Sequence, residues 1–264
     1  MDTLVVGAGA MGRWFGGCLA DATDGGVAFA DRDPAVAAAA ADAFDVARTA
    51  DLAGDERFDL VCIAVPISAT EAAIAEHAPR AERAILDVSG VMAGPVRAMA
   101  EHAPECERAS LHPLFAPANE PGNVPMVVDA DGPTIETVRS VLADRGNEVF
   151  ETTPQEHDEA MRTVQTRAHA AVLAYALAAD DVPERFHTTV SAALQDVVET
   201  VTGNEPSVYA EIQGTFEGAN EVAEAARRIA EADTAEFERL YREATGGAAG
   251  SGGGDAPCAT ARRY

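Results

Sequence analysis

Three glycines near the start of the chain are spaced to bind a phosphate group. Gly7, Gly9 and Gly12 follow the apolar run at 4–6 and precede a segment with helical apolar periodicity. A strand that turns into a helix over such glycines gathers free backbone N–H groups at the positive end of the helix dipole. Gly7 permits the tight turn, Gly9 lets phosphates approach the backbone, and Gly12 lets the helix pack closely. The pattern predicts a dinucleotide-binding loop formed by Gly7, Ala8, Gly9, Ala10, Met11 and Gly12.

An acidic residue after the next apolar run indicates which dinucleotide fits. The run at 27–30 ends in Asp31, which is 19 residues after Gly12. A carboxylate at this distance accepts a hydrogen bond from the ribose 2′-hydroxyl of NAD and repels the 2′-phosphate of NADP. We therefore expect NAD as the cofactor and NADP less readily, although Arg32 could pair with a phosphate.

The end of a later apolar run, at 58–65, should lie on the same edge of the sheet. Ligands of parallel sheets bind outside the carboxyl ends of the strands. An ordinary strand end that stops at a proline would have the same letters, so both interpretations stay open. The cofactor-binding interpretation predicts contacts from Ala64, Val65 and Pro66.

Two residues that could move a proton follow two further runs. Ser89 comes after the apolar run at 84–88, and His112 ends the run at 108–111 and is followed by loop residues. A lone histidine is more often structural, but a place at the end of a central strand suits a proton acceptor equally well. Neutral imidazole has a reference pKa of about 6.5, which fits that role near neutral pH.

Polar residues also share one face of a long predicted helix that starts at 154. His157, Met161, Gln165 and His169 are spaced four apart. Core packing explains Met161, but two histidines and a glutamine on that face indicate a polar cleft or a partner subunit. Asp158 and its acidic neighbour at 156 are explained by favourable charge at a helix N-terminus.

The elements that must position these residues alternate between strands and helices over the first 150 residues. We expect an α/β fold, a Rossmann-type doubly wound parallel sheet, in a domain at 1–152. Strands are predicted at 3–7, 26–30, 58–65, 84–88, 108–111, 125–129 and 147–151. Helices are predicted at 10–21, 34–42, 68–78, 94–103 and 132–144.

After residue 152 the pattern becomes entirely helical. Prolines and glycines divide the rest of the chain into predicted helices at 154–181, 186–203, 205–227 and 233–244. We expect an all-helical substrate and dimerisation domain at 153–245. The residues at 246–264 are rich in glycine and predict a flexible tail.

Charge and composition limit the possible partners. The chain of 264 residues has a formal net charge of −25 and contains arginine but no lysine. An acidic excess of this size argues against nucleic acid and membrane surfaces as partners. The composition resembles that of proteins from salt-loving archaea, in whose cytoplasm the Debye length falls to about 3 Å at molar salt.

Cysteine usage and hydropathy add to these limits. The cysteines lack metal-ligand spacing, and we expect no metal site. Because no signal peptide or membrane-spanning run is found, we expect a cytoplasmic protein. The four cysteines are Cys18, Cys62, Cys106 and Cys258.

Taken together, these segments resemble the prephenate dehydrogenases of tyrosine biosynthesis, over roughly residues 2–240. The matching segments are GAGAMGRWF at 7–15, CIAVPISAT at 62–70, DVSGVMAGPVRAM at 87–99, HPLFAP at 112–117, EHDEAMRTVQTRAH at 156–169 and NEPSVYAEI at 204–212. The resemblance implies an NAD-dependent, monofunctional enzyme that oxidises and decarboxylates prephenate to 4-hydroxyphenylpyruvate. It also implies a homodimer formed through the helical domain.

The resemblance assigns roles to single residues. It implies that His112 is the proton acceptor, and that Gln165 and His169 lie in the substrate pocket. The family commonly has a serine at the position of Gly90, where its hydroxyl supports the catalytic histidine. In this chain the serine stands one residue earlier, and we expect Ser89 to take that part.

Two further departures concern cations. A lysine that is common in the family is replaced by Met92, and the arginine that binds the ring carboxylate of prephenate aligns with Thr200. Arg162 is our expected substitute, with Arg167 and Arg185 as alternatives. These departures leave other functions open: an arogenate dehydrogenase, another dehydrogenase of small acids with a helical second domain, or an NAD-binding regulator that has lost catalysis.

Overall fold

The fold is built on one eight-stranded sheet. The structure, a computed structural model, describes residues 1–203 and 205–248, and the side chains up to 245. The strand order is β3-β2-β1-β4-β5-β6-β7-β8. The strands are β1 Thr3–Val6, β2 Val27–Ala30, β3 Ala47–Thr49, β4 Phe58–Ile63, β5 Ala81–Asp87, β6 Glu107–Leu111, β7 Asn123–Ala130 and β8 Glu148–Glu151.

The sheet is mostly parallel, as predicted, with one reversal. Strands β1 to β6 run parallel, whereas β7 is antiparallel to β6 and parallel to β8. The connection from β6 to β7 covers only 112–122 and contains one short 3-10 turn, Pro117–Asn119. A parallel return needs a longer crossover, usually through a helix, so the chain turns back instead. The short strand β3, with its half-exposed and exposed residues, was not predicted.

Helices cover both faces of this sheet. Successive strand residues point to opposite faces, so Val5 packs on the same side as Phe15 of α1 while Val6 packs on the other. Helices α1, α2 and α5 lie on the first face, and α3 and α4 lie on the second. Their bounds are α1 Ala10–Ala22, α2 Pro34–Ala41, α3 Thr70–His77, α4 Ala93–His102 and α5 Pro133–Asp144.

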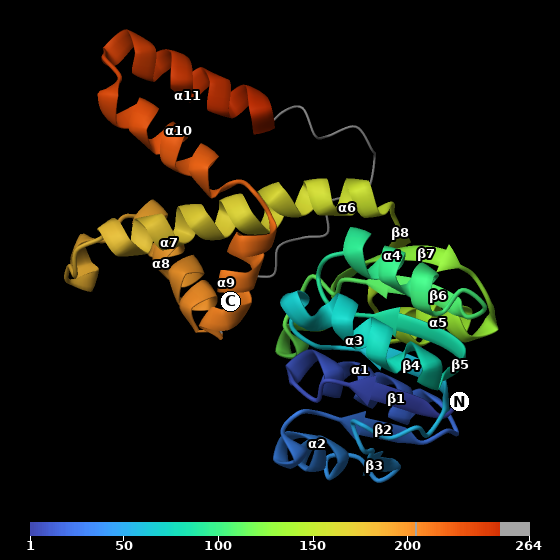
Figure 1. Ribbon diagram of the computed structural model, residues 1–264. Helices are drawn as coiled ribbons and strands as arrows, with labels where there is room; N and C mark the ends of the chain where they lie inside the picture. Colours follow the sequence, from blue (N-terminus) through green and yellow to red (C-terminus); the bar gives the residue numbers. More distant parts are fainter. Residues whose placement is uncertain (204, 249–264) are drawn as a thin grey trace.

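The rest of the described chain is helical and gathers around one long helix that leaves the sheet (Figure 1). That helix consists of α6, a π-helical segment and α7, so the helix predicted at 154–181 is present but irregular. The helices are α6 Pro154–Met161, the π-helical segment Arg162–Arg167, α7 Ala168–Ala178, α8 Thr189–Thr202, α9 Pro206–Thr215, α10 Ala219–Glu231 and α11 Thr234–Ala248.

The helix predicted at 205–227 is wrong, because the chain divides there into α9 and α10. Gly218 lies at the break, with a φ of +150° that favours glycine. A Cβ at this position would lie 3.1 Å from the carbonyl oxygen of Arg162. The close approach of α10 to the π-helical segment therefore fixes the bend. At the other end, α11 continues to Ala248, and the part of the predicted tail at 249–264 lies outside the described residues.

Strand register brings α6 to the sheet edge where ligands are expected. Leu111 of β6 pairs with Met126 of β7, which in turn pairs with Glu151 of β8. The residue after Leu111 and the first turn of α6 therefore start from the same level of the sheet. Across this edge an apolar contact joins the helices to the strand ends; it is made by Met161, Ile212 and Phe216 with Ile67, Val91 and Leu114.

The structure also describes the cysteines and the hydropathy of the helices. Cys18 and Cys62 are buried, Cys106 is half-buried, and Cys258 lies outside the described residues. Within 1–203 and 205–248, no group of three histidine, cysteine or carboxylate side chains gathers as a metal site. In the same ranges no helix is both long and apolar enough to cross a bilayer.

Candidate active site

The glycine-rich loop has the geometry that its spacing predicts. Gly7 has a φ of +96°, and a Cβ there would lie 2.3 Å from the carbonyl oxygen of Ala64. A Cβ on Gly12 would lie 1.9 Å from the carbonyl oxygen of Gly7, whereas one on Gly9 would meet open space. Helix α1 begins beyond this opening without a side-chain cap. Its first N–H groups and the open side of Gly9 suit a pyrophosphate group.

Asp31 is held directly beside this loop. One of its carboxylate oxygens accepts a hydrogen bond from the Ala8 N–H at 2.8 Å, and the other accepts one from the Asp33 N–H at 2.9 Å. Each oxygen keeps a second lone pair, which is available to a ribose hydroxyl. Arg32 is exposed. The segment after β4 packs against the loop from the other side, because Ala64 donates its N–H to the carbonyl oxygen of Val6 at 2.7 Å.

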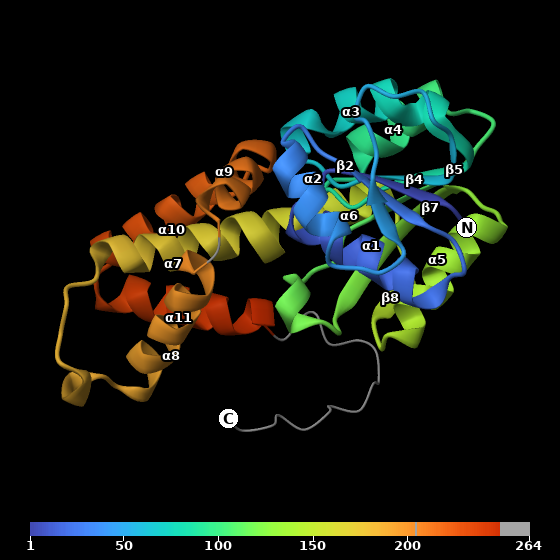
Figure 2. The same ribbon diagram turned by 90° about the horizontal axis from the view of Figure 1, so that it is seen from below.

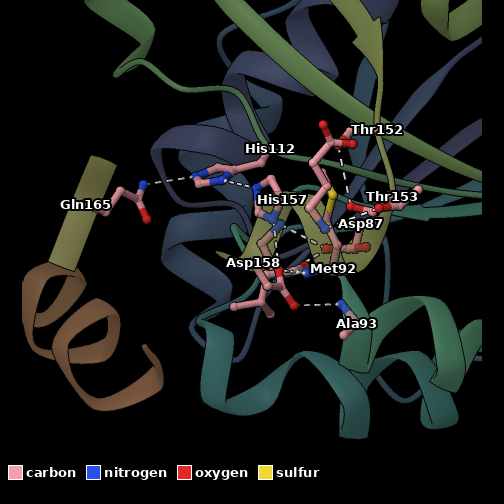
Figure 3. A network of polar contacts seen from close by, with 12 residues as sticks. Asp87, Met92, Ala93, His112, Thr152, Thr153, His157, Asp158 and Gln165 are labelled. Atoms are coloured by element: carbon pink, nitrogen blue, oxygen red, sulfur yellow. Dashed lines mark hydrogen bonds and ion pairs between the residues drawn. The ribbon is translucent and has the colours of Figure 1, made fainter. Parts of the chain in front are cut away.

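A chain of hydrogen bonds runs through His112 (Figure 3). His112 follows β6 directly and is 8% exposed. Its Nδ1 lies 2.9 Å from Nε2 of His157, and Nδ1 of His157 lies 2.8 Å from a carboxylate oxygen of Asp158. On the other side of the ring, Nε2 of His112 lies 3.3 Å from the amide nitrogen of Gln165. The structure thus brings together one residue from a strand end and three from the long helix.

Hydrogen-bond direction fixes the protons along this chain. An ionised Asp158 only accepts, so Nδ1 of His157 must carry the hydrogen between them. Nε2 of the neutral His157 ring is then an acceptor, and Nδ1 of His112 donates to it. Consequently Nε2 of His112 has no hydrogen, and the Gln165 amide donates to its lone pair. The site therefore presents one imidazole nitrogen that is ready to take a proton.

Electrostatics keep His112 neutral. Burial is the largest cause, and it lowers the pKa of His112 from 6.5 to about 3. Burial raises the pKa of Asp158, but hydrogen bonds from His157 and from the Ala93 and Met92 N–H groups outweigh it, and the net pKa lies below its ordinary value. These N–H groups, 3.2 and 3.1 Å from the two carboxylate oxygens, belong to the start of α4, where negative charge is favoured.

Ser89 was expected to support His112, but its hydrogen bonds go to the carboxylate of Asp87. Its hydroxyl and N–H donate to Asp87 at 2.5 and 3.0 Å, and Asp87 is fully buried. Burial raises the pKa of Asp87 to about 6, despite the hydrogen bonds from Ser89. The neighbouring Gly90 is the residue that faces His112. Its φ is +93°, and a Cβ there would lie 3.2 Å from Nε2 of His112.

Of the expected substrate residues, Gln165 contacts His112, whereas His169 contacts Tyr209. Gln165 contacts His112, and its amide oxygen is buried without a hydrogen-bond partner among the described residues. Nδ1 of His169 is also buried without a hydrogen-bond partner among the described residues. The centroid of the His169 ring lies 4.7 Å from that of the Tyr209 ring. Burial lowers the pKa of His169. Arg162 is exposed, and the hydrogen bonds of His112 go to His157 and Gln165.

The π-helical segment explains how residues spaced four apart stay on one face. An α-helix turns by about 100° per residue, so a spacing of four drifts by about 40° at each step. The wider turn of the segment Arg162–Arg167 counteracts this drift between Met161 and His169. Short π-helical turns of this kind occur frequently at functional sites.

Sequence reasoning missed three contributors to this site. His157 was assigned to a polar face and Asp158 to the helix dipole, because nothing in the sequence shows that His157 meets His112 across 45 residues. Asp87 was passed over as part of a strand. The one available signal was the block of three ionisable residues at 156–158, which is more than a helix start requires.

Comparison with known proteins finds a matching family model and a relative that aligns over most of the chain. A family model described as the nucleotide-binding domain of prephenate dehydrogenase matches residues 20–124. The chain is 30% identical over 270 residues to 4-amino-4-deoxyprephenate dehydrogenase of Streptomyces pristinaespiralis, and the alignment covers 92% of this chain and 89% of that protein.

Solved structures share the whole fold. Prephenate dehydrogenase from A. aeolicus, in complex with hydroxyphenyl propionate and NAD+, has a TM-score of 0.62 at 19% identity, covering 94% of this chain and 97% of that one. Synechocystis arogenate dehydrogenase has a TM-score of 0.58 at 17% identity, covering 94% of this chain and 99% of that one. Together with the near full-length relative, these matches place the molecule among the oxidoreductases: the chain belongs to the prephenate dehydrogenase family.

Proposed function

We propose that the chain is an NAD-dependent prephenate dehydrogenase of tyrosine biosynthesis, which converts prephenate to 4-hydroxyphenylpyruvate and CO2. The observation that carries this proposal is the unprotonated Nε2 of His112, held at the carboxyl edge of the sheet by His157 and Asp158. The edge also contains the glycine-rich loop, so a proton acceptor and a dinucleotide site meet there.

The residues of the loop fit the cofactor. The open side of Gly9 and the first N–H groups of α1 would hold the pyrophosphate, and Asp31 would bind the adenosine ribose. Ala64, Val65 and Pro66 border the same loop. When bound, NAD supplies a nicotinamide ring that accepts a hydride. The A. aeolicus structure contains NAD+ and supports this choice.

His112 then has a defined part in the reaction. The ring carbon that bears the hydroxyl loses its hydrogen with both bonding electrons, so positive charge develops on the substrate. Nε2 of His112 accepts the hydroxyl proton and relieves that charge. The bond to the ring carboxylate breaks, its electrons complete the aromatic ring, and CO2 leaves. The proton returns from His112 to the phenolic oxygen, so atoms and charge balance.

The protein contributes position more than chemical force, because aromatisation drives the reaction. A positioned general base accounts for about 10²–10⁴ of the rate, and orientation of the two reactants accounts for much of the rest. The dry surroundings of His112 keep its imidazole unprotonated, so no proton has to be removed before each turnover.

A second substrate is favoured by one observation. The Streptomyces relative is named for 4-amino-4-deoxyprephenate, in which an amino group replaces the ring hydroxyl. Here Gly90 places no hydroxyl against His112, and the amide oxygen of Gln165 is a buried acceptor beside it. An amino group has one hydrogen for the amide oxygen of Gln165 and another that can replace the Gln165 amide at Nε2 of His112. Arogenate, which differs from prephenate only in its side chain, is the third candidate.

We predict that prephenate gives the highest kcat/KM, measured as NADH release with equal concentrations of prephenate, arogenate and 4-amino-4-deoxyprephenate. A higher value with either of the others would reassign the substrate. Binding of NAD without NADH release from any of the three would favour a regulator without catalysis and contradict the proposed reaction.

Replacing the base tests the mechanism. We expect His112→Asn to lower kcat by about 10²–10⁴-fold, because the proton then has no acceptor. Its affinity for NAD and its thermal unfolding should stay close to those of the unchanged enzyme. A folded variant with near-normal turnover would show that another group is the base.

The pH profile gives the same mechanism a second check. Because the pKa of His112 is about 3, its protonation should not reduce kcat/KM between about pH 5 and 8. Asp87, with a pKa of about 6, is the neighbouring group that titrates in this range. The profile should therefore be compared with that of Asp87→Asn. An acid limb near the ordinary imidazole value that survives in this variant would contradict our assignment.

Cofactor preference should depend on Asp31. We expect NAD to give a higher kcat/KM than NADP, because the carboxylate faces the 2′-phosphate. Asp31→Ser should shift the ratio toward NADP. Since Asp31 also holds the glycine-rich loop through Ala8, the ratio of the two cofactors is the informative quantity. If Asp31→Ser leaves the ratio of kcat/KM for the two cofactors unchanged, or if the unchanged enzyme already favours NADP, Asp31 does not determine the cofactor preference.

We also propose that the chain is a homodimer. Helix α10 buries none of its residues among the described part of the chain, and apolar side chains remain exposed on α10 and on the segments around it. They include Leu177, Phe186, Val190, Ile229, Phe237 and Tyr241.

Light scattering in high salt should give about twice the chain mass of 27.4 kDa. Low salt should weaken the dimer, since the net charge of −25 is then less screened. A single species of 27.4 kDa at every salt concentration would exclude it.

A further inference from the structure

A carboxylate of the helical part reaches the strand ends on the opposite side of the cofactor loop from Asp31. Glu211, on α9, accepts a hydrogen bond from the Ile67 N–H at 2.9 Å with one oxygen. Its other oxygen accepts one from the Ser68 hydroxyl at 2.6 Å. These residues are 144 and 143 positions apart in the sequence, so the contact exists only when the helices dock on the sheet.

The contact supplies a helix cap that the local sequence lacks. Ile67–Ala69 is a 3-10 turn that leads directly into α3, and neither Pro66 nor Ala69 offers a side-chain cap. The first N–H groups of such a turn need an acceptor, and negative charge is favoured at that end. The carboxylate of Glu211 is an acceptor and carries negative charge, so its hydrogen bonds are charge-assisted. The apolar contact between Ile212 and Ile67 lies alongside it.

The capped segment is continuous with the wall of the glycine-rich loop. Ile67 follows Pro66 directly, and the carbonyl oxygen of Ala64 leaves no room for a Cβ on Gly7. A shift of the segment at 64–68 would therefore change the shape of the loop that receives the pyrophosphate. Contacts run without interruption from Glu211 through this segment to Gly7.

We propose that Glu211 is a positioning residue for the dinucleotide. It holds the segment at 64–68 in the shape that the cofactor binds, and so couples docking of the helices to cofactor affinity. The inference rests on the proposed function, because it takes this loop as the NAD site. The coupling is reciprocal by linkage, so a bound dinucleotide strengthens the docking of α9 to the same extent.

Glu211→Gln tests the proposal, since it removes the charge and keeps the size. We expect the Kd for NAD, measured directly by titration calorimetry, to rise about tenfold, and the KM for NAD to rise with it. The kcat and the KM for prephenate should change by less than about threefold. Glu217→Gln is the matched control, because it makes the same charge change at an exposed residue between α9 and α10. It should leave the Kd unchanged.

Ser68→Ala provides a second variant, at an exposed position where folding is not at risk. It removes one of the two donors to Glu211, so we expect a smaller rise in the Kd. The double variant with Glu211→Gln should show less than the sum of the two effects on the free energy of NAD binding, because both act through one contact.

The outcomes separate this inference from the proposed function. An unchanged Kd for NAD in Glu211→Gln, or additive effects in the double variant, would overturn the positioning role alone. Loss of thermal stability and of kcat with a normal Kd would also overturn it, in favour of a general structural contact. An unchanged enzyme that binds no NAD would overturn both.

Discussion

The negative charge of Asp158 is the constraint on which the site depends. A carboxylate that accepts from His157 determines which nitrogen of each ring carries a hydrogen, and the order it sets ends in an unprotonated nitrogen on His112. Placing a charge in a half-buried position is costly unless its oxygens are satisfied. Here the two N–H groups at the start of α4 satisfy them. The tautomer of His112 is thus fixed by a helix terminus in another part of the chain.

Asp158 and Glu211 show the same arrangement twice. Each is a carboxylate on the helical side that accepts a backbone N–H at the start of a helix or 3-10 turn on the sheet side. The apolar contact of Met161, Ile212 and Phe216 with the strand-end loops joins the same two parts. Polar groups thus define the relative orientation of the two parts, while apolar packing holds them together. Such a boundary specifies one docking position, because either carboxylate would lose its partners after a small shift.

Much of this could be predicted from the sequence, for physical reasons that differ by element. The sheet, its covering helices and the glycine-rich loop follow from local patterns, since apolar runs and glycine spacing act over a few residues. The reversal at β7 depends on the length of the connection after His112, which the pattern of apolar residues does not reveal. The division at Gly218 depends on how closely α10 packs against Arg162. The pairing of His112 with His157 depends on strand register.

The site shows the same division between local and long-range information. His112 and Gln165 were identified because their positions on a strand end and a helix face are local properties. Ser89 was expected beside His112, but its hydroxyl donates a hydrogen bond to Asp87, which is only two residues away. Asp158 looked like an ordinary first-turn acid. Its role depends on contacts with residues 65 and 66 positions away.

The π-helical segment Arg162–Arg167 sets the rotation of α7 relative to α6 about the axis of the long helix. Removal of one residue there would restore the regular α-helical hydrogen bonds, because a π turn contains one residue more than an α-helical turn. The following helix would keep nearly the same rotational phase, whereas removal of a residue from a regular stretch would turn it by about 100°. A single-residue insertion or deletion within Arg162–Arg167 therefore changes the length of this helix by one residue, while the faces of α6 and α7, the sheet and the glycine-rich loop remain unchanged.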